Sequence, residues 1–232
     1  MDERYSRMEP LFGADALARL ASSRVAVFGA GGVGGYAIET LARSGAGAID
    51  VFDGDVFARS NLNRQLLALE STIGRAKAEV AAERIAAINP RCAATAHRMF
   101  YGPGNSAEVD LRVFSCVIDA VDDVAAKKEL VRKCGEASVP LVCCTGAGNR
   151  FDPTAFRVAD IHETHGDPLA RIMRAYCREA GVEKLRAVFS TEPPRKPATG
   201  RVPASGAFAP AAAGLAAAYA AVACITGVPF DG

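Results

Sequence analysis

The stretch GAGGVGGYAIETL, residues 29–41, decides the fold of this chain. It directly follows the apolar run RVAVF (24–28) and leads into a helix-forming sequence. A glycine turn between a strand and a helix lets phosphate groups approach the backbone, and the helix amino terminus offers N–H donors and partial positive charge. The turn alone does not distinguish a dinucleotide from a nucleoside triphosphate. The glycines of this predicted nucleotide-binding turn are Gly29, Gly31, Gly32 and Gly34.

Strand and helix patterns alternate on both sides of the turn. Such alternation predicts an α/β fold, here a doubly wound, mostly parallel Rossmann-like sheet. We expect one domain over residues 1–232, in which an arm and helix (1–23) precede a nucleotide-binding core (24–150) and a substrate or interface region (151–232). The expected strands are 24–28, 48–52, 93–100, 114–118 and 140–144, and the expected helices are 15–22, 33–44, 77–88, 125–137 and 210–225.

Carboxylates follow two of the expected strands. Asp53 lies 24 residues after Gly29 at the end of the second strand, where a carboxylate can bind a ribose, and Asp55 shares its turn. Asp122 follows the fourth strand, and a carboxylate there can hold Mg²⁺ beside substrate phosphates. Its neighbours Asp119 and Asp123 could serve instead as the N-cap of the next helix.

A polar cluster after the second strand favours a triphosphate over a dinucleotide. A triphosphate carries more charge than a helix terminus neutralises, and fixed Arg and Lys side chains are the usual partners of a phosphate leaving group. One helical turn would place Asn61 and Arg64 on the same face. Lys77 opens the following helix, where a cation opposes the helix dipole, which hints at a functional role. The candidate nucleotide-site residues of this cluster are Asn61, Arg64, Gln65 and Lys77.

The amino-acid composition further narrows the classes of protein to which this chain could belong. With 27 basic and 26 acidic residues the net charge is +1, which favours neither a nucleic-acid coat protein nor an acidic tail. The charged MDERYSRMEP start lacks the apolar core of a secretory signal, and seven cysteines without a C-x-x-C pair favour reduced thiols in the cytoplasm. Residues 202–230 carry no charge, but their Ala, Gly and Pro content predicts a helix buried in a core or subunit interface rather than a membrane span.

Positive charge is unevenly distributed. Residues 171–201 contain eight basic and three acidic residues, a local charge of +5 against −4 for the remainder. Such a zone is a candidate footprint for a phosphate backbone, although a solvated helix face and loop would have the same charge.

These motifs, taken in order, resemble the E1-like adenylating superfamily, which includes enzymes that activate ubiquitin-like sulfur carriers. The resemblance over residues 4–150 rests on GAGGVG, the Asp53 exit, SNLNRQ, Lys77, INP (88–90) and IDAVD (118–122). The stretches 146–174 and VFSTE (188–192) are similar to the tRNA threonylcarbamoyladenosine dehydratase branch, so the resemblance covers nearly the whole chain.

The resemblance implies a specific reaction and set of partners. ATP would activate the carboxylate of threonylcarbamoyladenosine at position 37 of tRNA, and a nitrogen of the same side chain would close a ring. It implies phosphate contacts from Gly31 and Gly32, ribose contact from Asp53 and Mg²⁺ binding by Asp122. It also implies a monovalent cation (Na⁺ or K⁺), and a homodimer in which an arm arginine, Arg7 more than Arg4, reaches the partner's ATP.

Three other hypotheses remain open at this stage. A sulfur-carrier adenylyltransferase would act on a carboxyl-terminal Gly-Gly, but many such enzymes have paired C-x-x-C motifs and a catalytic cysteine. Pro203 stands where some relatives have a cysteine before Ala204-Ser205-Gly206, which leaves a sulfur-relay partner in doubt. A scaffold that only binds is disfavoured by Arg64, Lys77 and Asp122, and a dehydrogenase by the lack of an evident acid–base pair after residue 122.

Overall fold

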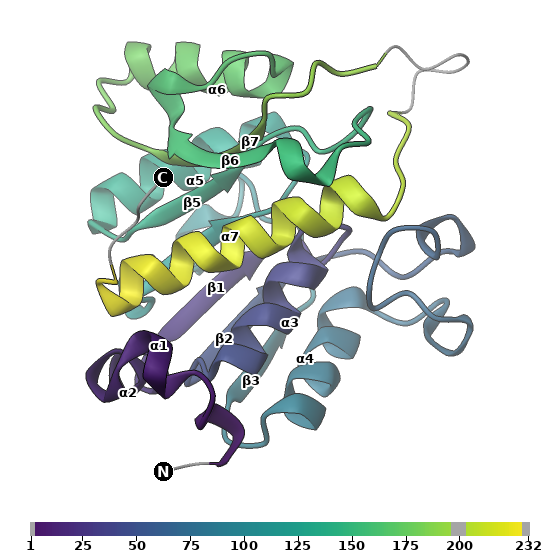
Figure 1. Ribbon diagram of the computed structural model, residues 1–232. Coiled ribbons are helices and arrows are strands. Elements are labelled where there is room, and N and C mark those ends of the chain that lie inside the picture. Colours follow the sequence, from purple (N-terminus) through teal and green to yellow (C-terminus); the bar gives the residue numbers. More distant parts are fainter. Residues whose placement is uncertain (1–2, 196–202, 229–232) are drawn as a thin grey trace.

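The computed structural model describes residues 3–195 and 203–228, which form one seven-stranded sheet flanked by helices on both faces (Figure 1). The strand order is β3-β2-β1-β4-β5-β7-β6, and only β6 runs antiparallel to its neighbour. The reversal of strand order beside β1 creates the crevice in which such sheets bind ligands. The strands are β1 (Arg24–Phe28), β2 (Ala48–Phe52), β3 (Ala93–His97), β4 (Cys116–Asp119), β5 (Leu141–Cys144), β6 (Phe156–Asp160) and β7 (Arg186–Ser190).

Two apolar layers cover the sheet. Ile38 and Leu41 of α3 and the alanines of α7 fill the first, and Leu130 of α5 and Met173 of α6 belong to the second. The central strands β1, β4 and β5 are buried on both faces, which explains their nearly continuous apolar sequences. The helices of four or more residues are α1 (Glu9–Phe12), α2 (Ala14–Ala21), α3 (Gly34–Ser44), α4 (Lys77–Ile88), α5 (Val124–Ala137), α6 (Pro168–Glu179) and α7 (Phe208–Thr226).

The predicted Rossmann-like sheet is confirmed, with differences at strand ends and in the second half. The third strand ends at His97 rather than residue 100, because residues 98–105 turn away and border a cleft. The sequence patterns missed β6, α6 and β7. The edge strand β6 is only partly buried, and the apolar runs of β6 and β7 are too short to stand out in the sequence.

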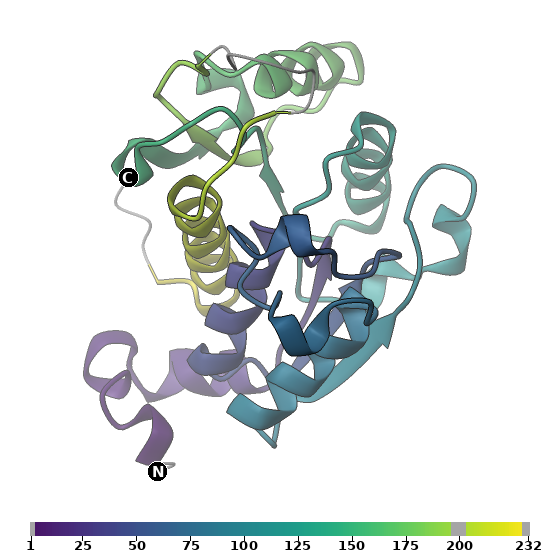
Figure 2. The same cartoon turned by 90° about the vertical axis from the view of Figure 1, so that its right-hand side faces the viewer.

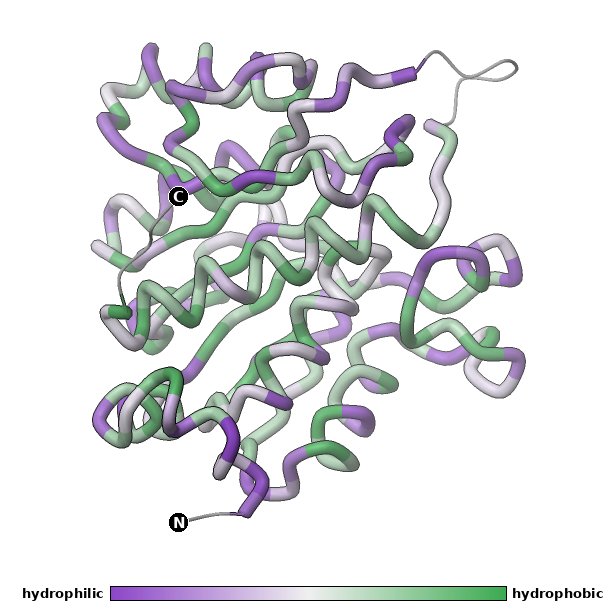
Figure 3. Tube along the Cα trace, in the orientation of Figure 1, coloured by the Kyte–Doolittle hydropathy of each residue, from purple (hydrophilic) through white to green (hydrophobic). Residues whose placement is uncertain are grey.

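Helix α7 is the uncharged helix expected near the end of the chain, and it lies across the sheet beside α3 (Figure 1; Figure 2 shows it nearly end-on). It is apolar along its whole length (Figure 3). By length and composition alone it could cross a membrane, but just over half (56%) of its most apolar window is buried against the rest of the protein. A Cβ on Gly214 would lie 2.3 Å from the Val33 carbonyl oxygen, so α7 approaches α3 closely only because this residue is glycine.

The amino-terminal arm lies at the amino edge of the sheet. Arg4 donates to the Asn89 side chain (2.8 Å) just after α4, and the Tyr5 ring packs beside Gly45 just after α3. Both contacts are at helix ends opposite the glycine turn. The arm, which includes the exposed Arg7, therefore lies at the edge of the sheet opposite the glycine turn of its own chain.

Candidate nucleotide-binding site

A cleft of about 1020 Å³ opens at the carboxyl ends of β1, β2, β4 and β5. This volume suits a nucleotide with part of a second substrate, since ligand pockets commonly hold 300–1,000 Å³. The structure brings nine of the twelve predicted site residues to this cleft: Gly29, Gly31, Gly32, Asp53, Asp55, Arg64, Gln65, Lys77 and Asp122.

The glycine turn has the geometry that its sequence predicts. Gly29 has a φ of +91°, and a Cβ there would lie 2.7 Å from the Ala120 carbonyl oxygen. Gly34 begins α3 beneath the turn, where a Cβ would lie 1.7 Å from the Gly29 carbonyl oxygen. Any side chain at either position would push the turn out of shape, so the amide groups keep their positions only with glycine.

The carboxylate of Asp53 braces the turn from the end of β2. Its Oδ2 accepts from the Ala30 backbone N–H (2.7 Å), and its Oδ1 accepts from the Asp55 N–H (2.8 Å). Each oxygen keeps a further lone pair, so Asp53 can still accept from ribose hydroxyls. Asp53, the residue predicted to bind the ribose, therefore also holds the glycine turn in its shape.

Two cations enter the cleft from the segment after β2. The Lys77 side chain is 8% exposed, and its Nζ donates to Asp55 Oδ2 (3.0 Å). The Arg64 Nη1 donates to the Ser60 carbonyl (2.8 Å) and to Asn63 Oδ1 (2.9 Å), and this fixes the guanidinium. A cation held in place before a ligand arrives is well suited to stabilise developing negative charge.

Two buried polar atoms at the cleft have no hydrogen-bond partner within the described residues: Gln65 Oε1 and the Tyr101 hydroxyl. The Gln65 amide lies next to the glycine turn, with Nε2 3.8 Å from the position of a Cβ on Gly31. Tyr101 packs edge-on against Phe28, with ring centroids 4.7 Å apart. Buried polar atoms are rarely left unpaired, so the Gln65 amide beside the glycine turn supports a cleft that binds a polar ligand, whereas the Tyr101 hydroxyl lies near Ser106 and Glu129.

Three predicted residues do not line the cleft. The Asn61 Oδ1 accepts from the Ala58 N–H (3.0 Å) and caps a short 3-10 helix at Arg59–Asn61, which turns it away from Arg64. Gly34 lies beneath the turn, and Arg7 lies at the opposite edge of the sheet. The helical turn expected here does form, since the Asn61 carbonyl accepts from the Arg64 N–H (3.1 Å) and the Gln65 N–H (2.9 Å), but the Asn61 side chain bonds to Ala58 and does not line the cleft with Arg64.

The acidic residues after β4 divide their roles. Asp122 is exposed at the cleft, and no other described residue bonds to its carboxylate. Asp123 is the N-cap of α5 and accepts from the Ala126 N–H (2.7 Å), as one of the two alternatives proposed. Asp119 is fully buried and accepts from Lys127 Nζ (2.9 Å). Asp122 alone of the three is available to an incoming cation.

Sequence reasoning missed two buried cations beside the cleft. Lys127 donates to Asp119 and to the Cys144 carbonyl (2.6 Å), and joins β4 to the end of β5. Arg150 forms a buried ion pair with Asp167 (3.0 Å) and also donates to the Gly146 carbonyl (2.9 Å). Lys127 lies in none of the motifs singled out in the sequence, and Arg150 lies in the 146–174 stretch but was given no role there; the burial of both depends on contacts between distant segments.

The rim of the cleft joins residues far apart in the sequence. The Asn63 amide donates to the Ser205 carbonyl (2.9 Å), and the Asn149 Oδ1 accepts from the Ala204 N–H (2.7 Å). Pro203, Ser205 and Pro210 all line the cleft. The region after residue 151 therefore completes the nucleotide cleft and is not a separate unit.

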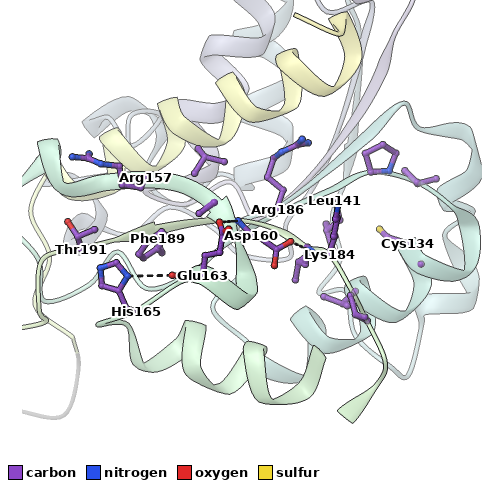
Figure 4. Close-up of a pocket in the computed structure, with 18 residues that line it drawn as sticks. Cys134, Leu141, Arg157, Asp160, Glu163, His165, Lys184, Arg186, Phe189 and Thr191 are labelled. Carbon is purple, nitrogen blue, oxygen red and sulfur yellow. Dashed lines mark hydrogen bonds between the residues drawn. The ribbon is translucent and has the colours of Figure 1, made fainter. Parts of the chain in front are cut away.

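A second cavity of about 900 Å³ lies beside the strands β5, β6 and β7 and the end of α5 (Figure 4). Arg157, Lys184 and Arg186 lie around it together with Asp160 and Glu163 (Figure 4). Two of these cations belong to the basic segment noted in the sequence; Lys196 and Arg201 of that segment lie outside the described residues. The opposite charges largely compensate each other within the cavity.

All seven cysteines are free, as predicted. Cys144 lines the cleft, but burial raises the pKa of its thiol to about 12. Since the thiolate is the nucleophilic form, Cys144 is protonated and unreactive at neutral pH.

These features define a class of protein. A glycine turn at a helix amino terminus, a carboxylate that braces this turn, two fixed cations and a second, available carboxylate are the features of an α/β site for a phosphorylated nucleotide. The family model described as "ThiF family" matches residues 5–230, and the chain belongs to that family.

Relatives and solved structures agree with this assignment. The chain is 40% identical to the tRNA threonylcarbamoyladenosine dehydratase of Bacillus subtilis (strain 168), over 93% of this chain and 91% of that protein. It is similar to the crystal structure of the E. coli tRNA N6-threonylcarbamoyladenosine dehydratase TcdA in complex with AMP, with a TM-score of 0.90, 38% identity and 97% and 94% of the two chains covered. The structure of TcdA in complex with ATP matches at a TM-score of 0.88 and 37% identity, with the same coverage.

Proposed function

We propose that this protein is an ATP-dependent tRNA threonylcarbamoyladenosine dehydratase that closes a ring at position 37 of tRNA. The observation that carries the proposal is the cleft itself, in which Arg64 and Lys77 face a glycine turn beside an unpaired carboxylate. Relatives with this name cover nearly the whole chain, and one of them binds ATP and AMP in crystals.

The chemistry requires little from the protein beyond binding and charge. A carboxylate becomes electrophilic when one of its oxygens is bonded to phosphorus and can leave as AMP or phosphate. A nitrogen of the same side chain then attacks the carbonyl carbon, and the nucleoside loses one water overall. Because the attack is intramolecular, proximity replaces an enzyme nucleophile. Lys77 and Arg64 would stabilise the charge that develops on the phosphates.

Mg²⁺ would be held by Asp122. The cleft residues fit this ion, because an exposed carboxylate without a protein partner lies at the end of β4, and Mg²⁺ binds through one or two carboxylates together with substrate phosphates. The ion would neutralise charge on the phosphates. The tRNA would contact the basic segment that begins at Arg171, and a cytoplasmic location, which the free cysteines favour, belongs to the same proposal.

Mass spectrometry of nucleosides tests the proposal directly. The protein is incubated with Mg²⁺, ATP and tRNA that bears threonylcarbamoyladenosine, and the tRNA is then digested. We expect that nucleoside to lose the mass of one water only when ATP is present. An unchanged nucleoside, with ATP–pyrophosphate exchange appearing only after a Gly-Gly-ended carrier protein is added, would favour the sulfur-carrier adenylyltransferase instead.

Cys144 separates the two hypotheses further, since a sulfur-transfer enzyme needs a reactive cysteine. We expect Cys144→Ala to keep nucleoside dehydration within about threefold of the wild type, because loss of a covalent nucleophile costs orders of magnitude more. Rates of ATP turnover and of ring closure are measured before and after treatment with iodoacetamide. Inactivation of the wild type that Cys144→Ala prevents would contradict the expectation. No cysteine precedes Ala204, so we propose no sulfur-relay partner that bonds there.

The proposal includes a homodimer. Phe208, Leu215 and Tyr219 of α7 are all at least half exposed, and Phe208 packs edge-on against the exposed Phe151 (5.6 Å). A second copy covering this surface would remove it from water, and Arg7 would reach the partner's cleft.

Leu215→Glu tests the dimer, because a buried carboxylate at an apolar interface is costly. We expect sedimentation to show a monomer for Leu215→Glu and a dimer for the wild type. Val113→Glu is the matched control, since Val113 is equally exposed (50% against 51%) but lies away from α7. Dissociation by both variants, or by neither, would place the interface elsewhere.

A further inference from the structure

The monovalent cation implied by the family resemblance needs a buried position lined by oxygen atoms, since carbonyl oxygens replace the hydration shell of K⁺. Next to the nucleotide cleft, main-chain carbonyls converge on the guanidinium of Arg150. Its Nε donates to the Gly146 carbonyl (2.9 Å), and its Nη1 is 3.4 Å from the Ser190 carbonyl. Its Nη2 donates to Asp167 Oδ2 (3.0 Å). These acceptors come from three separate segments of the chain.

The side chain of Arg150 is 1% exposed and that of Asp167 is fully buried, so a fixed positive charge fills the position. Asp167 Oδ2 also accepts from the Thr145 hydroxyl (2.9 Å) and the Gly146 N–H (3.1 Å). Oxygens that would otherwise ligate a cation are already bonded to a side chain of this chain. Lys127, another buried cation beside the cleft, likewise donates to the main-chain carbonyl of Cys144.

The bonds of Arg150 act on the wall of the cleft. Thr145, Gly146, Ala147 and Gly148 line the cleft, while Arg150 itself does not. Arg150 fixes the carbonyl of Gly146, and the next residue back, Asn149, pairs with Ala204 on the rim. Arg150 is therefore a positioning residue for the 145–148 wall rather than a group that touches the nucleotide.

We propose that the Arg150 guanidinium takes the place of a monovalent cation in this protein, so that nucleotide binding requires neither K⁺ nor Na⁺. A guanidinium suits this role because it is weakly hydrated, permanently charged and has five donors in a rigid plane. The proposal builds on the proposed function but concerns only the ATP site, so it is tested without tRNA.

The test measures ATP affinity by calorimetry and the melting temperature of the ATP-free protein. Both are measured in tetramethylammonium, sodium and potassium chloride at equal ionic strength, with ATP as its tetramethylammonium salt. For the wild type we expect the same Kd and the same melting temperature in all three salts. A tighter Kd or a higher melting temperature in K⁺ or Na⁺ would overturn the proposal, and this measurement needs no variant.

Arg150→Ala should create the requirement that the wild type lacks. In tetramethylammonium chloride we expect ATP binding about tenfold weaker, because the wall of the cleft is misplaced. K⁺ or a low concentration of guanidinium should restore the Kd and raise the melting temperature. Arg150→Lys should bind ATP without K⁺, and the exposed Arg112→Ala should show no response to cations. A folded Arg150→Ala that binds ATP normally without K⁺, or that no cation restores, would also overturn the proposal.

These outcomes remain distinct from those of the proposed function. A protein that binds ATP independently of K⁺ but leaves the tRNA nucleoside unchanged would contradict the dehydratase assignment and leave the role of Arg150 intact. If the protein closes the ring but binds ATP more tightly in K⁺, the dehydratase assignment would hold and the proposed role of Arg150 would be contradicted.

Discussion

Lys77→Met should reduce ATP-dependent dehydration of the tRNA nucleoside by about 100-fold to 1000-fold, the usual cost of removing one preorganised donor at a developing charge. Lys77, the first residue of α4, is the most deeply buried cation that lines the cleft, and its ammonium group is held by the Asp55 carboxylate. Methionine keeps most of the apolar stem, so the loss should come from the missing charge. The measurement is kcat/KM with ATP varied at saturating tRNA.

Lys184→Met is the matched control for this variant. Lys184 is exposed and lines the second cavity rather than the nucleotide cleft, so kcat/KM for ATP should stay near the wild-type value. Circular dichroism should show that both variants are folded. A Lys77→Met enzyme with nearly normal kcat/KM would mean that Lys77 serves only to hold Asp55 and the start of α4.

Lys127→Met should lower the free energy of unfolding by roughly 3–5 kcal/mol, because it leaves the carboxylate of Asp119 buried without its cation. Both side chains are completely buried, and their charged atoms are 2.9 Å apart. Burial alone lowers the pKa of Lys127, but the attraction of Asp119 outweighs it, and the pKa lies above its ordinary value. The lysine is therefore charged at neutral pH. Urea unfolding monitored by circular dichroism measures the loss.

Two comparisons test the cause of that loss. Lys133→Met removes a lysine of the same helix whose ion pair with Glu136 is partly exposed, and it should cost less than about 1 kcal/mol. The double variant Lys127→Met/Asp119→Leu removes both charges and should recover part of the lost stability, since an apolar pair can replace a buried ion pair. A double variant less stable than Lys127→Met alone would show that Asp119 stabilises the fold through Cys143 and Val121 instead.

The first half of the fold was predictable because each signal there is local. The strand RVAVF, the glycine turn and the amphipathic pattern of 77–88 each depend on neighbouring residues, and α4 runs over Lys77–Ile88 as expected. The order of the strands and the position of the cleft then follow from the handedness of parallel connections and the reversal of strand order. Most predicted cleft residues lie at strand ends or in the turn for this reason.

The rest of the site depends on contacts between segments far apart in the sequence, and the spacing of residues along the chain does not predict such contacts. Asn61 was expected beside Arg64 at the site, and the helical turn between them forms, but the Asn61 side chain satisfies the Ala58 N–H instead of lining the cleft. The pair of Arg150 and Asp167 bridges two loops, and Asn149 meets Ala204 across 55 residues. Such pairs become visible only once the sheet has brought β5, β7 and the start of α7 together.

Helix α7 connects events at the cleft to the outer surface of the molecule. Pro210 packs against Gly32 in the phosphate turn, Gly214 packs against the first turn of α3, and Leu215 faces outward one residue later. In the proposed dimer, α7 would have one side on the glycine turn and the other on the second copy, and a rigid helix in that position would transmit small displacements between them. Under that proposal, ATP binding and the arrangement of the two subunits would be mechanically coupled, and a substitution on either side of α7 would affect the other.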